Sequence, residues 1–329
     1  MTQAPLLSVE DLRTYCYTRA GVVKAVDGVR FALERGDSLG LVGESGSGKS
    51  MTCNSILRLL PKPAARTVGG RVLWDGRDLL TLSEREMRRV RGREIGMILQ
   101  DPLISLNPVF TIANQVGEPF RLRGAAKGRS DLREKVLDVL RQVHIPSPEA
   151  RLSQYPFEFS GGMRQRTVAA IALAGSPGLL IADEPTTSLD VTIQDQFLRL
   201  LRELQEKTGM ALILVTHDLG IVAETCNKVA VMYAGKIVEF GDVRQVLTSP
   251  AHPYTEALLK ALPVPGTRQK RLYQISGEPP NLLDPPAGCA FEPRCHRAMQ
   301  ACKKARPPIK RLSDGRQAAC LALEAGEVR

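Results

Sequence analysis

A glycine-rich loop of eight residues constrains this chain more than any other feature. It reads Gly43-Glu-Ser-Gly-Ser-Gly-Lys49-Ser50, directly after a buried-strand pattern at Ser38 to Gly43 and directly before a helical pattern at Lys49 to Leu60. Such glycines let backbone N–H groups surround phosphate oxygens, while a lysine reaches the terminal phosphates and a hydroxyl reaches Mg²⁺. A chance run of glycine and serine is the alternative, and the flanking strand and helix disfavour it. The pattern predicts a phosphate site that comprises Gly43, Glu44, Ser45, Gly46, Ser47, Gly48, Lys49 and Ser50.

A second apolar run, beginning at Leu179, ends in the carboxylates Asp183 and Glu184. A strand that ends in two carboxylates can place Asp183 to hold the water shell of a magnesium ion. Glu184 can then orient or deprotonate a water in line with a γ-phosphate. Taken alone, two acidic residues after a strand are equally typical of a helix N-terminus.

Further polar residues occur between and beyond these two motifs. Ser160-Gly161-Gly162-Met163 precedes an apolar helical pattern, and glycines at a helix start expose donors that suit a second anion contact. Gln100 ends the apolar run from Ile95, and Thr187-Ser-Leu-Asp190 follows the carboxylate pair. His217 ends the run from Ala211, where a lone histidine is more often structural than catalytic.

Strand and helix patterns alternate for about 250 residues, which predicts an α/β fold with a mostly parallel sheet. Helical spacing at Asp131 to Val143 indicates a mainly helical subdomain at about 101–160. After one further helical pattern at Tyr254 to Leu262 the chain becomes proline-rich, with 10 of the 22 prolines in the final 79 residues. We therefore expect one domain at 1–250 and a small extension at 251–329.

Composition excludes several classes of protein. The chain is 43% hydrophobic and 24% charged, which is typical of globular proteins rather than disordered or fibrous ones. Its strongly apolar runs, such as Met210 to Val215, are far shorter than the roughly 20 residues that cross a bilayer. Residues 1–13 lack a basic stretch followed by an apolar block, so we expect no export signal and a location inside the cell.

The last 79 residues are unusual in charge and in cysteine content. They hold 13 lysines and arginines against 7 acidic residues, which suits an anionic partner or simply a solvated surface. Four of the seven cysteines crowd there, which in a reducing compartment favours metal or redox chemistry over disulfides. Their spacing matches no common zinc finger, so an iron–sulfur cluster, zinc and unmetallated thiols all remain open. These cysteines are Cys289, Cys295, Cys302 and Cys320.

Taken together, the order and spacing of the motifs resemble those of an ATP-binding-cassette (ABC) ATPase. The resemblance covers residues 9 to about 245 and implies an ABC-type, RecA-like P-loop nucleotide-binding domain with a helical subdomain. Gln100 to Pro108 is similar to the Q-loop region of bacterial peptide and nickel importers, and His252 to Thr255 is similar to dipeptide and oligopeptide importer ATPases. The corresponding motifs are Walker A at Gly43 to Ser50, the Q-loop at Gln100, the signature at Ser160 to Met163, Walker B through Asp183, the catalytic Glu184, the D-loop at Ser188 to Asp190 and the switch His217.

The resemblance assigns roles to these residues. Lys49 and the loop backbone hold the phosphates of ATP, while Ser50 and Gln100 bind Mg²⁺ and Asp183 fixes its water shell. Glu184 acts on the attacking water, and His217 contacts the γ-phosphate. ABC ATPases pair head to tail, so Ser160, Gly161, Gly162 and Met163 would serve the nucleotide of a second subunit, with Asp190 in the D-loop between the sites.

The resemblance also implies partners and a location. We expect an ATP-hydrolysing subunit of a bacterial di- or oligopeptide importer, peripheral on the cytoplasmic face of the inner membrane. Its partners would be a second homologous ATPase, with a heterodimer favoured, two transmembrane permease subunits and, indirectly, an extracytoplasmic peptide-binding protein, but no nucleic acid. Importer ATPases with such a tail are associated with a [4Fe-4S] cluster, so the resemblance favours this cluster over zinc.

Two departures and three alternatives accompany this interpretation. The signature carries Met163 where glutamine is common, and Cys16 stands where an aromatic usually stacks on adenine. Strand alternation puts Tyr15 and Tyr17 on the face opposite Cys16, which leaves three alternatives for that role: Tyr15, Tyr17 or neither. The alternatives are an importer of nickel or haem, a soluble ABC ATPase that acts on nucleic acid, and a cassette that binds ATP without hydrolysing it. The intact Lys49 and Glu184 disfavour the last.

Overall fold

The computed structural model describes residues 4–187, 189–262 and 273–325, and the chain divides into two compact units. The first unit combines Met1–Leu33, Leu39–Leu80 and Thr216–Arg329, and the second combines Glu34–Ser38 and Thr81–Val215. Both contain β-sheet and helices, which confirms the predicted α/β class. The residues on both sides of the boundary predicted at residue 250 belong to the first unit, and the boundary itself stays a prediction.

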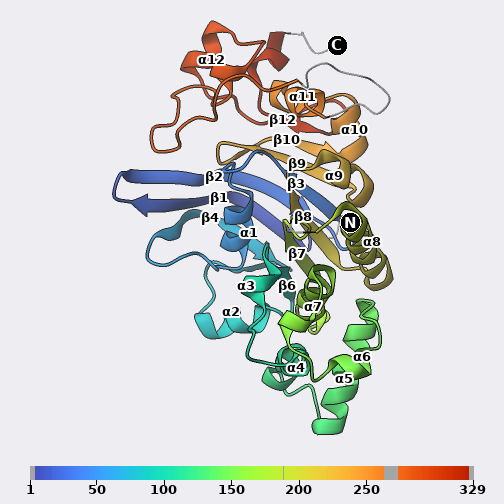
Figure 1. Ribbon diagram of the computed structural model, residues 1–329. Coiled ribbons are helices and arrows are strands. Elements are labelled where there is room, and N and C mark those ends of the chain that lie inside the picture. The colour runs from blue at the N-terminus through green and yellow to red at the C-terminus, as the bar shows by residue number, and fades with distance from the viewer. Residues whose placement is uncertain (1–3, 188, 263–272, 326–329) are drawn as a thin grey trace. The chain divides into compact units, whose positions relative to one another are not determined.

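The first unit contains an antiparallel sheet with the strand order β2-β1-β4-β5 (Figure 1). Its inner face packs on α1, which contacts three of the strands, and the Thr14 hydroxyl lies 2.7 Å from that of Ser55 in this buried layer. The β1 and β2 strands are joined by a tight turn, so together they form one long hairpin. The bounds are β1 Leu7–Thr18, β2 Gly21–Leu33, β4 Ala65–Trp74, β5 Arg77–Asp78 and α1 Lys49–Ile56.

A second group of strands in this unit has the order β11-β12-β10-β9-β3, in which β3 and β9 are parallel. The two short strands of the C-terminal extension pair with each other, and β12 adds to the edge of β10, so the extension continues the sheet of the preceding domain. The strands are β3 Ser38–Val42, β9 Lys228–Tyr233, β10 Lys236–Asp242, β11 Lys310–Arg311 and β12 Gln317–Ala318. The helices are α9 Leu219–Thr225, α10 Val243–Thr248, α11 Pro253–Lys260, η2 Glu292–Arg294, α12 Gln300–Lys304 and η3 Leu321–Ala325.

The second unit is built on the parallel strands β6, β7 and β8, in the order β8-β7-β6. β7 and β8 are buried along their whole length, which is typical of the centre of a parallel sheet. Residues 101–160, predicted to be mainly helical, contain α3 to α6 and η1, and α4, α5 and α7 pack together. The bounds are β6 Ile95–Ile98, β7 Leu179–Asp183, β8 Ala211–Thr216, α2 Glu84–Val90, α3 Pro102–Ser105, α4 Ile112–Leu122, α5 Arg129–Gln142, α6 Pro148–Arg151, η1 Pro156–Glu158, α7 Gly161–Leu173 and α8 Val191–Thr208.

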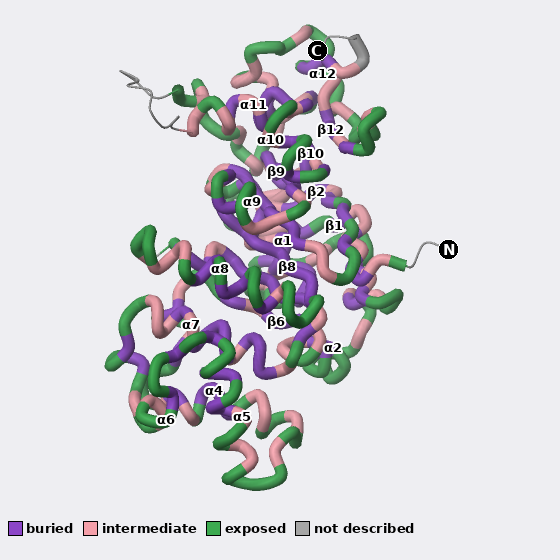
Figure 2. Tube along the Cα trace, turned by 90° about the vertical axis from the view of Figure 1, so that its right-hand side faces the viewer, coloured by how far each residue is buried: buried purple, intermediate pink, exposed green. Residues whose placement is uncertain are grey.

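Three aromatic rings join the C-terminal extension to the core of the first unit. Tyr233 ends strand β9, whose trace is mostly buried (Figure 2), while Tyr254 lies on α11 and Phe291 precedes η2. The ring centroids of Tyr233 and Tyr254 are 4.6 Å apart, and Phe291 lies 5.3 Å from each, edge-on to Tyr233. Such tilted and edge-to-face pairs contribute beyond the area that they bury. The extension therefore shares a core with the strand that precedes it.

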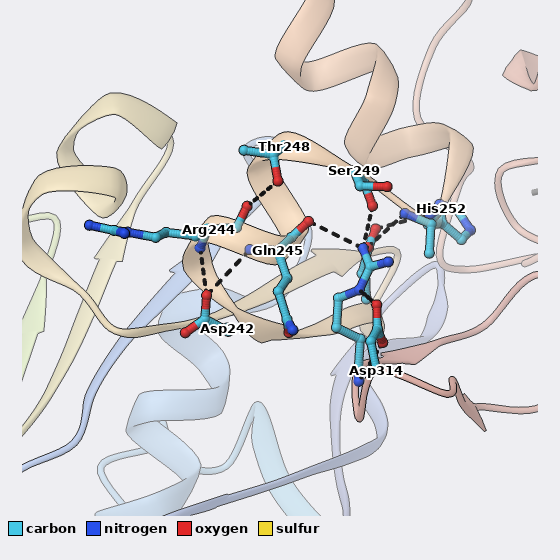
Figure 3. A network of polar contacts seen from close by, with 10 residues as sticks. Asp242, Arg244, Gln245, Thr248, Ser249, His252 and Asp314 are labelled. Atoms are coloured by element: carbon cyan, nitrogen blue, oxygen red, sulfur yellow. Dashed lines mark hydrogen bonds and ion pairs between the residues drawn. The ribbon is translucent and has the colours of Figure 1, made fainter. Parts of the chain in front are cut away.

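A polar network holds the segment between β10 and α11 to the same extension (Figure 3). Arg316, almost fully buried beside β12, is paired with Asp314 at 2.7 Å and donates to the backbone carbonyls of Gln245 and Ser249. Asp242 caps α10 by accepting the backbone N–H groups of the first turn. A buried guanidinium needs such partners, because an unpaired charge in a protein interior is costly.

His252 lies at the start of α11 and is buried and neutral. Its Nδ1 accepts the backbone N–H of Tyr254 at 3.0 Å, while the backbone N–H of His252 donates to the buried carboxylate of Glu239 at 2.9 Å. Burial lowers the pKa of the His252 imidazole to about 3. The imidazole therefore works as an uncharged helix cap rather than as a titrating group near neutral pH.

This burial predicts that His252 makes the fold less stable in acid. The unfolded imidazole gains a proton near pH 6.5, but the folded one only near 3, so its contribution is complete above pH 6.5 and is lost as the pH falls from 6.5 towards 3. Each pH unit in that window lowers the free energy of unfolding by about 1.4 kcal/mol. His252→Asn can still cap the helix but cannot titrate.

Urea unfolding of both proteins at pH 7 and pH 5 measures the effect. We expect the wild-type protein to lose about 2 kcal/mol more than His252→Asn over this range. An equal loss in the two proteins would show that His252 is not buried in its neutral form.

Candidate functional site

The phosphate loop has a backbone that only glycine can adopt at two positions. Gly43 has a φ of +153° and Gly48 a φ of +106°. A Cβ at Gly43 would lie 2.2 Å from the carbonyl oxygen of Met232, and one at Gly48 would lie 2.3 Å from that of Ala25. The loop is therefore packed directly against the backbones of β9 and β2, and any side chain at either glycine would displace it.

Lys49 and Ser47 are buried inside the loop. The Lys49 ammonium donates to the carbonyl of Gly43 at 2.7 Å and to that of Glu44 at 3.1 Å, and its side chain is almost fully buried. Within the described part of the chain, the buried Ser47 hydroxyl oxygen has no hydrogen-bond partner. Ser50, the second residue of α1, is half-buried beside them. A buried ammonium and an unsatisfied hydroxyl are suited to receive an anion.

In the second unit the structure brings Gln100 and Glu184 together. Gln100 follows β6 and Glu184 follows β7, so both lie at the carboxyl edge of adjacent parallel strands. The Gln100 amide donates to Glu184 Oε2 at 3.1 Å, and the Thr187 hydroxyl donates to the same oxygen at 3.2 Å. Sequence reasoning gave Thr187 no role, although a threonine three residues after an acidic residue is a common local hydrogen-bonding arrangement.

Glu184 also has an unusual backbone. Its φ is +43°, a left-handed conformation that is uncommon for residues other than glycine, and its N–H donates to the carbonyl of Val215 at 3.0 Å. The preceding Asp183 is buried at the end of β7. Strained conformations of this kind concentrate at functional sites, where they aim a side chain. Here the strain turns the Glu184 carboxylate out of the strand towards Gln100.

The predicted signature begins a helix. Ser160 caps α7 by accepting the N–H of Met163 at 3.4 Å, and both Ser160 and Gly161 are exposed. A Cβ at Gly162 would lie 2.6 Å from the side chain of Ile193 on α8, so this glycine permits close packing of the two helices. Asp190 caps α8 by accepting the N–H of Ile193 at 3.0 Å, whereas Ser188 lies outside the described residues.

The remaining predicted residues divide between the two units. Gly43 to Ser50 and the exposed His217 belong to the first unit, and Gln100, Asp183 and Glu184 belong to the second. Among residues 4–187, 189–262 and 273–325, no three His, Cys, Asp or Glu side chains are arranged to hold a metal ion. The magnesium roles of Ser50, Gln100 and Asp183, which come from both units, stay predictions.

Both tyrosines of the β1–β2 hairpin lie beside charged side chains. The Tyr15 hydroxyl donates to Asp27 at 3.0 Å, and the guanidinium of Arg66 lies 4.3 Å from the ring centre of Tyr17. Cys16 pairs across the hairpin with Val23, so these two share the other face. Which residue stacks on adenine stays open.

Val23 lines a cavity of about 390 Å³ beside the phosphate loop. Glu44 to Ser47 form one wall, and Pro279 to Leu283 of the C-terminal extension form another. The sequence gave no sign that the extension comes this close to the loop, because no periodic pattern or motif marks residues 279–283.

The four tail cysteines lie in one region. The Cys289 N–H donates to the carbonyl of Cys302 at 2.8 Å. Burial, together with the charges of the other three cysteines, raises the pKa of the Cys289 thiol to about 11. Backbone N–H groups point at the sulfurs of Cys289, Cys295 and Cys320 and oppose the effect of burial on their pKa values. The four thiols form no disulfide, and no metal-holding group is found in the described part of the tail.

Comparison with known families gives two matches. The ABC transporter family matches residues 26–187, and the C-terminal region of oligopeptide and dipeptide transporters matches residues 238–302. Together they cover the phosphate loop, the carboxylate pair and three of the four tail cysteines. The described residues contain no helix that is both long and apolar enough to span a bilayer.

Individual relatives agree with these matches over nearly the whole chain. A probable peptide ABC transporter ATP-binding protein of Sinorhizobium fredii is 52% identical, over 96% of this chain and 94% of its own. The dipeptide transport ATP-binding protein DppD of Bacillus subtilis is 47% identical over the same shares. Among solved structures, a dimeric bacterial ABC transporter cassette has a TM-score of 0.64 at 25% identity, covering 72% of this chain and 99% of that one.

Proposed function

We propose how this chain works, given that it belongs to the ABC transporter family and, within it, to the ATP-binding proteins of peptide importers. It is the ATP-binding subunit of a dipeptide or oligopeptide importer and an ABC-type ATPase, as the relatives that match it along nearly their full length support. These similarities favour peptide import over the nickel, haem and nucleic-acid alternatives. ATP and Mg²⁺ are the substrate and ion that such an ATPase uses.

The loop from Gly43 to Ser50 is the proposed ATP-phosphate site. Its support is the glycine-only backbone, which leaves main-chain amides to face phosphate oxygens, and the buried ammonium of Lys49. On ATP binding, Lys49 would exchange its contacts with the carbonyls of Gly43 and Glu44 for phosphate oxygens. Ser50, Gln100 and Asp183 offer the hard oxygen atoms that suit Mg²⁺, which when bound neutralises phosphate charge.

Glu184 is the proposed catalytic base. Its carboxylate is held by Gln100 and Thr187 at the end of a buried strand, and its left-handed backbone fixes the direction of the side chain. A carboxylate oriented in this way can position a water and accept its proton as the water attacks the γ-phosphate. His217 is proposed to contact the same phosphate.

A second ATPase subunit would complete the site. Ser160 and Gly161 are exposed at the start of α7, where backbone donors and a hydroxyl can meet the nucleotide of a neighbour. Asp190 caps the facing helix α8. One cassette per chain cannot supply both halves, so we propose a dimer with a homologous subunit, and a heterodimer in particular.

The helical segment after Gln100 is the proposed permease contact. It exposes several large apolar side chains, a pattern that marks protein–protein contacts when the side chains gather on a surface. The side chains are Leu103, Ile104, Val109, Phe110 and Phe157. Two permease subunits docked there would place the chain on the cytoplasmic face of the inner membrane, with the extracytoplasmic peptide-binding protein reached only through them.

Glu184→Gln should slow ATP hydrolysis by a factor of about 10² or more, because an amide cannot accept a proton from water. Glutamine keeps the size of the side chain, so ATP binding should persist and an ATP-bound dimer should accumulate. The rate of hydrolysis is measured as phosphate release by the assembled transporter. The accumulation of the dimer is measured by size-exclusion chromatography with ATP. The matched control is Glu206→Gln at an exposed ion pair on α8, which should hydrolyse ATP like the wild type. Full activity of Glu184→Gln would rule out its role as base.

We also propose that the four tail cysteines ligate a [4Fe-4S] cluster, with zinc as the alternative. The support is the gathering of four thiols in one region and the N–H groups aimed at three of the sulfurs, a feature that tunes iron–sulfur sites. Among the described residues, these thiols are not arranged as a metal-ligand set.

Protein purified without oxygen should be brown, contain about four irons per chain and bleach on reduction. Cys302→Ser should lose both iron and colour, whereas Cys226→Ser, outside the tail, should keep them. Colourless protein with one zinc per chain would establish the alternative, and metal-free protein would exclude both.

A further inference from the structure

One residue of the phosphate loop is held by the C-terminal extension. Arg294 contacts both carboxylate oxygens of Glu44, at 2.7 Å to Oε2 and 2.9 Å to Oε1. The backbone N–H of Glu44 donates to the Tyr254 hydroxyl at 2.9 Å. Glu44 is thus fixed through its side chain and its backbone by residues that follow it by more than 200 positions. All of these residues belong to the first unit.

Arg294 is itself held firmly. It ends the short helix η2, and its side chain is only 4% exposed. Its Nε donates to the carbonyl of Ser276 at 3.1 Å, and its Nη1 donates to the Tyr233 hydroxyl at 3.2 Å. The adjoining tyrosine rings belong to the aromatic cluster that joins the extension to the core. A bidentate contact from a guanidinium held in this way fixes the position of the carboxylate.

The path of the loop depends on this position. Lys49 donates to the carbonyls of Gly43 and Glu44, so the residue that Arg294 holds is also one that orients the lysine. Arg294 further neutralises the carboxylate, which would otherwise add a negative charge to a loop that must accept an anion. Both effects act on nucleotide binding and neither requires Arg294 to touch the nucleotide.

We propose that Arg294 is a positioning residue for ATP: it acts through Glu44 to hold the phosphate loop in its binding conformation and to neutralise the loop's carboxylate. The inference rests on the proposed ATP site at Gly43 to Ser50. It makes the extension a part of that site, because Arg294 belongs to the extension and contacts the loop through Glu44.

The test is a titration of the purified full chain with a fluorescent ATP analogue and Mg²⁺. Arg294→Gln should raise the Kd by about tenfold, a typical size for loss of one charge-assisted contact. Arg297→Gln, three residues further on, removes an exposed arginine that pairs with Glu256 and should stay within about twofold of the wild type. In the assembled transporter, Arg294→Gln should raise KM for ATP and leave kcat nearly unchanged.

A double variant separates electrostatics from general loss of structure. Glu44→Gln together with Arg294→Gln removes both charges and should bind more tightly than Arg294→Gln alone, because no uncompensated carboxylate remains on the loop. If Arg294→Gln does not fold, Arg294→Lys keeps the buried charge without the two-pronged contact, and about threefold weaker binding is expected. The thermal midpoint of each variant identifies those that are folded.

The outcomes are distinct. Wild-type affinity in folded Arg294→Gln, or in Arg294→Lys where the glutamine variant does not fold, would overturn the inference. Failure of the wild-type chain itself to bind the analogue would instead contradict the proposed ATP site.

Discussion

The close approach of backbone to backbone at the phosphate loop is the constraint on which the site depends. Gly43 lies against the carbonyl of Met232 on β9, and Gly48 lies against the carbonyl of Ala25 on β2. Because neither contact leaves room for a Cβ, the loop follows a single path between two strands of its own unit. The main-chain amides of the loop are thereby placed before any ligand arrives, and such preorganisation is what makes a phosphate site effective.

In the second unit, the position of a side chain rather than of the backbone is fixed. Glu184 follows a buried strand and has a left-handed backbone conformation. Its carboxylate accepts hydrogen bonds from Gln100, which follows the neighbouring strand, and from Thr187 in its own loop. The parallel order of β6 and β7 places these groups at one edge, where ligands of such sheets bind. Both units therefore hold a proposed site residue close to the end of a buried strand.

Many of the helices and strands around the candidate site could be predicted from local sequence patterns. The strand at Ser38–Val42 and the helix that begins at Lys49 lie where the loop motif required them, and α5 at Arg129–Gln142 follows the predicted apolar spacing. The helix predicted to reach Leu60 ends at Ile56, because Arg58 adopts a left-handed backbone well before Pro61. The pairing of Gln100 with Glu184 follows from the adjacency of β6 and β7, which the sequence analysis did not predict.

What could not be predicted depends on contacts between distant parts of the chain. Glu44 and Arg294 are separated by 250 positions, and no sequence motif links the two residues. The pairing of β12 with β10 and the aromatic cluster around Tyr233 likewise arise only when the extension folds back on the core. The cysteine spacing does not select a metal, because thiolates bind iron–sulfur clusters and zinc alike.

We propose above all that the main-chain amides from Gly43 to Ser50 hold the phosphates of ATP. Hydrogen–deuterium exchange of the full chain, with and without Mg²⁺ and a non-hydrolysable ATP analogue, tests it most directly. We expect slower exchange in the peptide that covers residues 43–50 when the analogue binds, and no such protection with AMP, which lacks the terminal phosphates. Saturating analogue that leaves exchange in this peptide unchanged would contradict it.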